Sequence, residues 1–309
     1  MIKYILKRLL MVIPVLLGVV FIVFFIMSLT PSCPGRIILG MGATEEAVEA
    51  LNISLGYNRP LLVRYVDYVI NAFQGDFGVS FRTQRPVFEE IFNRFPVTLL
   101  MTTLSVLATV IIGVPIGILS AVKQYTKIDI TVTVMAMFMA AIPGFWLGLL
   151  LLTLFSLVLG WLPSFGIGSW RHFVLPTITM AIPSAAMIIR MVRSTMLETI
   201  REGYIRTARA KGAPEWRVIW NHAFRNALLP IITLVGLSFG ALLGGTILVE
   251  RVFGLPGIGL LMITSITMKD IPLTMACTVW LATLFCLIVL IIDILYAFID
   301  PRIRAQFMK

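Results

Sequence analysis

The sequence predicts an all-α integral membrane protein with six transmembrane helices, and two observations carry this prediction. First, 59% of the 309 residues are hydrophobic and only 13% are charged, with a mean hydropathy of +0.98. So few charges leave too little polar surface for a soluble domain, which indicates a chain that lies in lipid. Second, six windows with few or no charges are long enough to cross a bilayer core, which takes about 20 helical residues. They cover residues 9–29, 97–122, 130–160, 173–195, 227–249 and 274–298.

The first window resembles the start of a signal peptide but is interpreted as a retained span. Residues Leu9 to Leu29 are uncharged, and this run is longer than the roughly 7–15 residues of a signal-peptide core. The third window is placed to end near Gly160, because Trp161 to Trp170 reads as a short aromatic loop at the membrane interface.

Basic residues predict the orientation of the chain. With the N-terminus inside, the inside segments hold sixteen basic and five acidic residues, a net charge of +11. The outside segments hold nine of each, a net charge of 0. Cytoplasmic loops of membrane proteins carry the excess of Lys and Arg. Both termini are therefore predicted to be cytoplasmic, and the overall charge of +10 needs no nucleic-acid partner.

The predicted layout has three parts: an N-terminal tail and first span (1–30), an extracytoplasmic helical segment (31–96) and a five-span core (97–309) with a cytoplasmic loop at 196–226. Two apolar stripes at helical spacing mark the extracytoplasmic segment. It either caps the bundle at the membrane surface or docks an outside partner, and both alternatives stay open. The first stripe is Leu62, Val66, Val69, Ile70 and Phe73, and the second is Phe88, Ile91, Phe92 and Phe95.

The residues that carry enzymatic chemistry are missing, so no catalytic residue, metal ligand or bound cofactor is predicted. The two histidines, His172 and His222, stand near no Ser/Asp or Cys arrangement with motif spacing. Cys277 and Cys286 lie in an apolar run and are interpreted as helix-packing residues. None of the seven lysines follows a glycine, which excludes the phosphate-binding GxxxxGK[ST] loop. If ATP drives this protein, another chain binds it.

The most informative stretch runs from Tyr204 to Pro230. Its start favours a short helix that Gly212 ends, and Pro214 with Glu215 begins a second helix. Such a rigid elbow suits transmission of a push from a soluble partner, and the small side chains of Ala208 and Ala210 leave room for close approach. The alternative is an ordinary basic loop held near anionic headgroups. The residues alone do not decide between these two.

The stretch from Tyr204 resembles the EAA loop of ABC importer permeases. The resemblance lies in the run Arg-Thr-Ala-Arg-Ala-Lys-Gly and in the later His-Ala-Phe-Arg-Asn-Ala. In particular it is similar to the dipeptide/oligopeptide/nickel permease family, as the B-type permease. Four further motifs extend the resemblance from end to end, except at Ser32–Gly35, where the usual Pro-Gly-Asp-Pro is replaced. They are Leu55-Gly-Tyr-Asn-Arg-Pro-Leu61, Gly75-Asp-Phe-Gly-Val-Ser-Phe-Arg-Thr83, Val249-Glu-Arg-Val-Phe-Gly-Leu-Pro-Gly-Ile-Gly259 and Asp300-Pro-Arg-Ile-Arg304.

The resemblance implies a type I importer permease of the cell membrane that moves di- or oligopeptides. It implies a second permease, two ATP-binding subunits that hold ATP and Mg, and an extracytoplasmic peptide-binding protein as partners. The alternatives are the same machinery with nickel or another chelated solute as cargo, an ion-coupled carrier, or a channel. The predicted ATPase-coupling residues are Arg206, Thr207, Ala208, Arg209, Lys211, Gly212, Ala213, Glu215 and Trp216.

Two further groups within the spans are predicted to have a role. Gly236, Gly240 and Gly244 repeat at spacing four on one helix face, which allows close helix contact or a place beside the path. Asp293 lies inside the sixth span, and a carboxylate at that depth needs a partner. Arg190 and Arg193, at the inner end of the fourth span, are the predicted partners in a buried ion pair.

Overall fold

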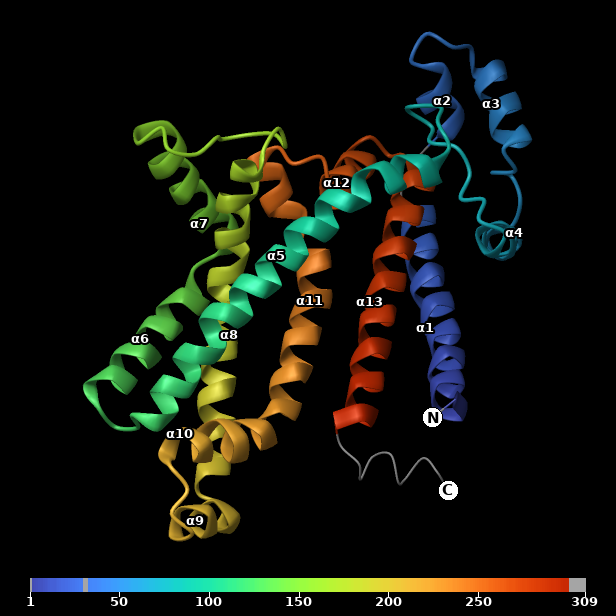
Figure 1. Cartoon of the computed structure of the whole chain (residues 1–309). Helices are drawn as coiled ribbons and strands as arrows, with labels where there is room; N and C mark the ends of the chain where they lie inside the picture. The colour runs from blue at the N-terminus through green and yellow to red at the C-terminus, as the bar shows by residue number, and fades with distance from the viewer. Residues whose placement is uncertain (1, 30–32, 300–309) are drawn as a thin grey trace. The chain divides into compact units, whose positions relative to one another are not determined.

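The computed structural model describes residues 2–29 and 33–299, and these residues form helices joined by short loops (Figure 1). Two compact units divide the chain. One consists of Ile2–Thr98 with Pro256–Leu287, and the other of Leu99–Leu255 with the described residues from 288 to 299. The only strand-like pairing in the described part is an isolated bridge between Val79 and Pro86.

The first unit contains α1 and the extracytoplasmic segment expected from the sequence. This segment forms three helices: α2 (Pro34–Leu39), α3 (Glu45–Ser54) and α4 (Leu61–Phe73). Figure 1 shows α2 and α3 beyond one end of α1, whereas α4 lies at its side. The other helices of this unit are the start of α5 (Val87–Val122), α12 (Ile258–Thr267) and the first part of α13 (Ile271–Ile299).

The second apolar stripe of the sequence forms the first turns of α5, where Ile91 and Phe95 pack within the same unit and Phe88 and Phe92 are exposed. Val87 and Ile91 are buried against Ile258, Leu273 and Cys277. Ile258 also donates its backbone N–H to the Thr98 hydroxyl over 2.8 Å, and Cys277 fills the packing role predicted for it.

Five helices are long and apolar enough to cross a membrane, or six if a bent pair counts as one span. These helices overlap all six windows found in the sequence, so the predicted helical membrane fold is confirmed. α5 and α8 run beyond their windows, because their polar outer turns continue the apolar helix. The long helices are α1 (Ile2–Leu29), α5, α8 (Val174–Ile200), α11 (Arg225–Phe253) and α13.

The third window is a broken span rather than one continuous helix. α6 (Lys127–Ala141) and α7 (Gly144–Leu151), which continues as a π-helical turn to Val158, meet at 97°. Ile142 takes extended backbone angles, with φ −73° and ψ 123°, because the following Pro143 disfavours the helical region for the residue before it. Pro143 also has no N–H to donate to the helical ladder.

The core of the second unit joins the ends of its helices that pack against residues 205–224. Val114 and Ile118 of α5 pack with Val192 and Met196 of α8, and Ile231 of α11 belongs to the same cluster. Two glycines let α5 approach α8: a Cβ at Gly113 would lie 2.9 Å from Ile188 Cγ2, and one at Gly117 would lie 2.9 Å from the Ile189 carbonyl oxygen. Small residues at spacing four permit such close crossings.

Candidate functional site

The candidate site is the elbow, defined here as residues 203–217, which connects α8 to α11. It begins with α9 (Gly203–Ala210) and continues with α10 (Glu215–Arg217), followed by a π-helical turn from Val218 to Phe224. Figure 1 shows α9 and α10 at the end of their unit that lies away from α7. The predicted helix, glycine break and proline-started helix are all confirmed.

Local hydrogen bonds explain why the chain turns at Gly212. Gly212 has φ +79°, a left-handed angle that glycine adopts without a steric cost. Its N–H donates to the Arg209 carbonyl over 2.9 Å, and the Ala213 N–H donates to the Ala208 carbonyl over 3.2 Å. These two bonds form a Schellman motif, which satisfies the last carbonyls of α9. Pro214 then precedes the first turn of α10.

A salt bridge joins the two arms of the elbow. Arg209 donates from Nε to Glu215 Oε1 over 2.7 Å and from a terminal nitrogen to Oε2 over 3.3 Å. The Arg209 and Glu215 side chains are 40% and 61% exposed, so this pair adds at most about 1 kcal/mol of stability. Its bidentate geometry instead orients the two helices relative to each other.

A second contact ties α9 to the start of α11. Tyr204 lies close to the Asn226 side chain of α11, whose amide donates to the His222 carbonyl over 2.6 Å. Partial burial raises the pKa of the Tyr204 hydroxyl, and the nearby Glu202 carboxylate acts in the same direction.

The inner face of the elbow is apolar and packs on the core of its unit. Ile205 and Val218 are fully buried, and Ala208 and Ala213 pack beside them on Met196 and its neighbours. The elbow thus packs as one body with the C-terminal ends of α5 and α8. Ala208 is partly buried against this core, whereas Ala210 is exposed, and close approach of a partner at these alanines stays a prediction.

The outer face of the elbow is basic and carries an exposed aromatic ring. Seven of the nine predicted coupling residues lie on it, and the Trp216 side chain is 58% exposed with the Arg217 guanidinium 5.5 Å from its ring centroid. A pocket of about 390 Å³ beside the elbow is lined in part by Arg201, Arg209 and Glu215. The seven exposed residues are Arg206, Thr207, Arg209, Lys211, Gly212, Glu215 and Trp216.

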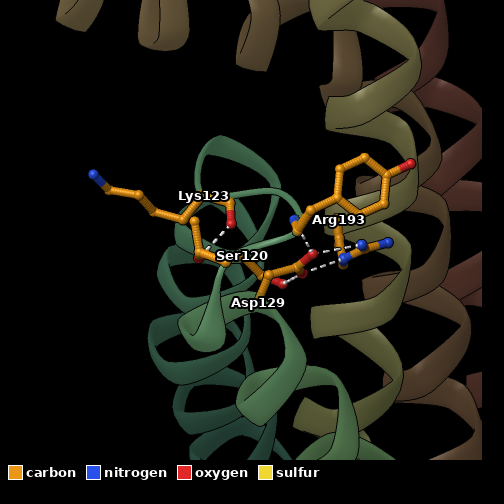
Figure 2. Close-up of polar contacts among 6 residues, drawn as sticks. Ser120, Lys123, Asp129 and Arg193 are labelled. Atoms are coloured by element: carbon orange, nitrogen blue, oxygen red, sulfur yellow. Dashed lines mark hydrogen bonds and ion pairs between the residues drawn. The ribbon is translucent and has the colours of Figure 1, made fainter.

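A buried ion pair fastens the α5–α6 turn to α8, the helix that leads into the elbow (Figure 2). Asp129 is 3% exposed and accepts from Arg193 Nε over 2.6 Å and from a second guanidinium nitrogen over 2.8 Å. The Ser120 hydroxyl donates to the same carboxylate over 2.6 Å, and the Tyr125 N–H donates over 2.9 Å. All four donors converge on the two oxygens of one side chain.

This network corrects the pairing predicted for Arg193, which contacts Asp129 and not Asp293. Arg190 is exposed, and its pairing with Asp293 stays a prediction. The sequence held a signal for the observed pair. Asp129 lies just before the apolar window 130–160, and Arg193 lies just inside the end of the window 173–195. In the sequence analysis Asp129 contributes only to the charge count, and Arg193 is assigned to Asp293 instead.

The three glycines of α11 do not share one environment. A Cβ at Gly236 would lie 2.3 Å from Ile292 Cδ1 of α13, so this glycine lies at a close helix contact within the chain. Gly240 is buried. Gly244 is exposed, and a Cβ there would meet no atom within 4 Å. The close contact predicted for Gly244 is therefore absent among the described residues.

Residues 2–29 and 33–299 contain no group of three His, Cys, Asp or Glu side chains that could hold a metal ion. The arrangement of the elbow supports mechanical contact with a partner. The described residues thus form a multi-span helical membrane protein with a basic, packed elbow between two of its spans.

Comparison with known proteins identifies the family. Residues 113–305 match the family described as binding-protein-dependent transport system inner membrane component, and residues 1–102 match its N-terminal component. The chain belongs to this family and is an ABC importer permease of the inner membrane.

Two relatives and one solved structure extend this identification. The glutathione transport system permease proteins GsiC of Escherichia coli (strain K12) and Salmonella typhi are each 42% identical over 304 residues, covering 98% of this chain and 99% of theirs. An inward-facing crystal form of the MetNI methionine ABC transporter has a TM-score of 0.59 at 23% identity, covering 68% of this chain and 96% of the matched one. The last similarity supports the type I permease fold.

Proposed function

We propose that this chain is one of two permeases of an ATP-driven importer of short peptides, including glutathione-like tripeptides. Full-length similarity at 42% identity to permeases of glutathione transport supports a small peptide as cargo. The absence of a phosphate-binding GxxxxGK[ST] loop in the sequence is consistent with ATP and Mg binding to partner subunits. An external peptide-binding protein would deliver the substrate to a path between the two permeases.

The orientation that we propose has both termini and the elbow in the cytoplasm. The charge difference of +11 against 0 between the two sets of segments supports it. The segment 31–96 then lies on the side of the delivering protein, and the elbow faces the ATPase subunits.

The observation that carries the mechanism is the division of the elbow into an apolar inner face and a basic outer face. Its inner face packs with α5 and α8, so a displacement of the outer face moves these helices with it. The exposed Arg206 and Lys211 favour an acidic partner surface. In this mechanism ATP binding and hydrolysis in the partner push the elbow, and the spans transmit the movement to the path.

The test is the ATPase activity of the reconstituted four-subunit importer with and without loaded binding protein. Ala210→Glu places a negative charge on the exposed basic face, and we expect at least a tenfold loss, about 1.4 kcal/mol, of the stimulation by substrate. Ala210→Gln has nearly the same size without the charge and serves as the matched control. Full stimulation and transport in the Glu variant would refute the docking role.

Cargo is tested in the same system with a dipeptide, glutathione and a nickel chelate on the binding protein. Stimulation by either peptide supports the proposal. Stimulation by the nickel chelate alone would assign the chain to metal import and leave the docking role intact.

A further inference from the structure

α4 carries a stripe of large apolar side chains that are exposed in the described part of the chain. This α4 stripe consists of Leu62, Val63, Val66, Ile70 and Phe73, whose exposed fractions run from 44% to 72%. Most of these residues recur every three or four positions and so lie on one face of the helix. Large exposed apolar patches mark contact with protein or with lipid.

The neighbouring face of α4 packs against the middle of α1. The ring centroid of Tyr65 lies 5.2 Å from that of Phe21 and 5.9 Å from that of Phe24, and Tyr68 also packs on Phe24 at 6.1 Å. The Tyr65 hydroxyl donates to the Leu17 backbone carbonyl over 3.0 Å. These contacts place α4 beside α1, as Figure 1 shows.

The position of Leu17 sets the depth of α4. The apolar helix of α1 spans Ile5–Leu29, and Leu17 is its midpoint, about 18 Å from either end at 1.5 Å per residue. A tyrosine side chain and one hydrogen bond cover much less than that distance. The backbone of α4 at Tyr65 therefore lies alongside the apolar part of α1, where the surroundings in a bilayer are acyl chains.

A third face of α4 is polar and points away from the α4 stripe. Arg64, Asp67 and Asn71 line a pocket of about 530 Å³, and Asp67 accepts from Arg59 over 3.2 Å. A helix with an apolar and a polar face is the form that lies in the plane of a membrane interface. Its helical hydrogen bonds also satisfy the backbone groups that lipid leaves unpaired.

We propose that α4 is an in-plane membrane helix and that acyl chains cover the α4 stripe. The polar face with Arg64 then borders the aqueous pocket, and the two tyrosines fix the helix to α1. Residues 61–73 are on this account a lipid-facing rim of the permease, whereas α2 and α3 remain available to partners outside the membrane.

The test measures how oxygen and a water-soluble nickel chelate collide with spin labels on the full chain. Single cysteines replace Val66 and Ile70 on the α4 stripe, and Asp67 and Asn71 on the polar face, after the native cysteines are changed to serine. The chain is reconstituted in phosphatidylethanolamine–phosphatidylglycerol vesicles, alone and with its partner subunits. All four positions are exposed, so a label disturbs the packing little.

We expect high oxygen and low nickel collision rates at positions 66 and 70, and the reverse at 67 and 71, in both preparations. High nickel rates on the α4 stripe would mean that water covers it and would overturn the proposal. Low rates for both reagents in the assembled complex would mean that a partner protein covers the α4 stripe and would overturn it equally. Equal collision rates at positions 66 and 70 and at positions 67 and 71 would show that α4 does not lie in the membrane plane.

Discussion

Removing the Asp129 carboxylate should destabilise the permease more than removing any exposed charge. Asp129→Ala leaves the Arg193 guanidinium and the buried Ser120 hydroxyl without their acceptor. Breaking a buried ion pair from one side costs about 3–5 kcal/mol. Because the Arg193 side chain is 27% exposed and water can reach it, we expect about 2–4 kcal/mol.

The matched control is the exposed pair formed by Arg59 and Asp67, whose side chains are 60% and 49% exposed. Asp67→Ala should cost no more than about 1 kcal/mol. Thermal unfolding of the purified protein in one detergent compares the two variants. Equal melting temperatures for Asp129→Ala and Asp67→Ala would refute the reasoning.

A double-mutant cycle tests whether the stabilisation comes from the pair itself. Arg193→Ala in the Asp129→Ala background removes the charge left without a partner, so the double variant should recover part of the loss. Arg193→Lys keeps the charge but loses the two-pronged geometry of the guanidinium, and it should be intermediate. Strictly additive losses would mean that Asp129 and Arg193 act separately.

Two further predictions concern helix contact and orientation. Gly236→Leu should disrupt expression or transport, because the new side chain would overlap Ile292. Gly244→Leu should be tolerated in the chain without its partners, because a side chain there points into open space. Similar folding yields for the two variants would contradict this prediction. A membrane-impermeant thiol reagent applied to intact cells should label cysteines introduced in residues 45–54 but not in 203–217, and the opposite pattern would reverse the orientation and with it the proposed role of the elbow.

The local sequence was sufficient for the elbow. The run that ends at Gly212 predicts a helix stop, and Pro214 with Glu215 predicts a new start, because these signals depend on the backbone preferences of a few adjacent residues. The sequence did not indicate which small residues face inward. Ala208 and Ala210 are chemically alike, and only the packing of α9 on the core separates the partly buried one from the exposed one.

The sequence could not decide whether a proline in an apolar window breaks its helix or leaves it continuous. Pro14 and Pro183 lie inside continuous helices, whereas Pro143 stands at a 97° break. The residue type is the same in all three cases. Membrane helices tolerate proline where neighbouring groups satisfy the freed carbonyls, and those neighbours come from distant parts of the chain.

By itself the sequence determined the six apolar segments, the charge difference that predicts their orientation, and the turn chemistry of the elbow, because hydropathy and backbone preference act over short stretches. Only the tertiary structure decided that Arg193 pairs with Asp129, that Gly236 rather than Gly244 lies against α13, and that α4 lies beside the middle of α1. These contacts join residues far apart in the chain. They depend on which helices pack together and at what depth, and the residue type alone does not specify either.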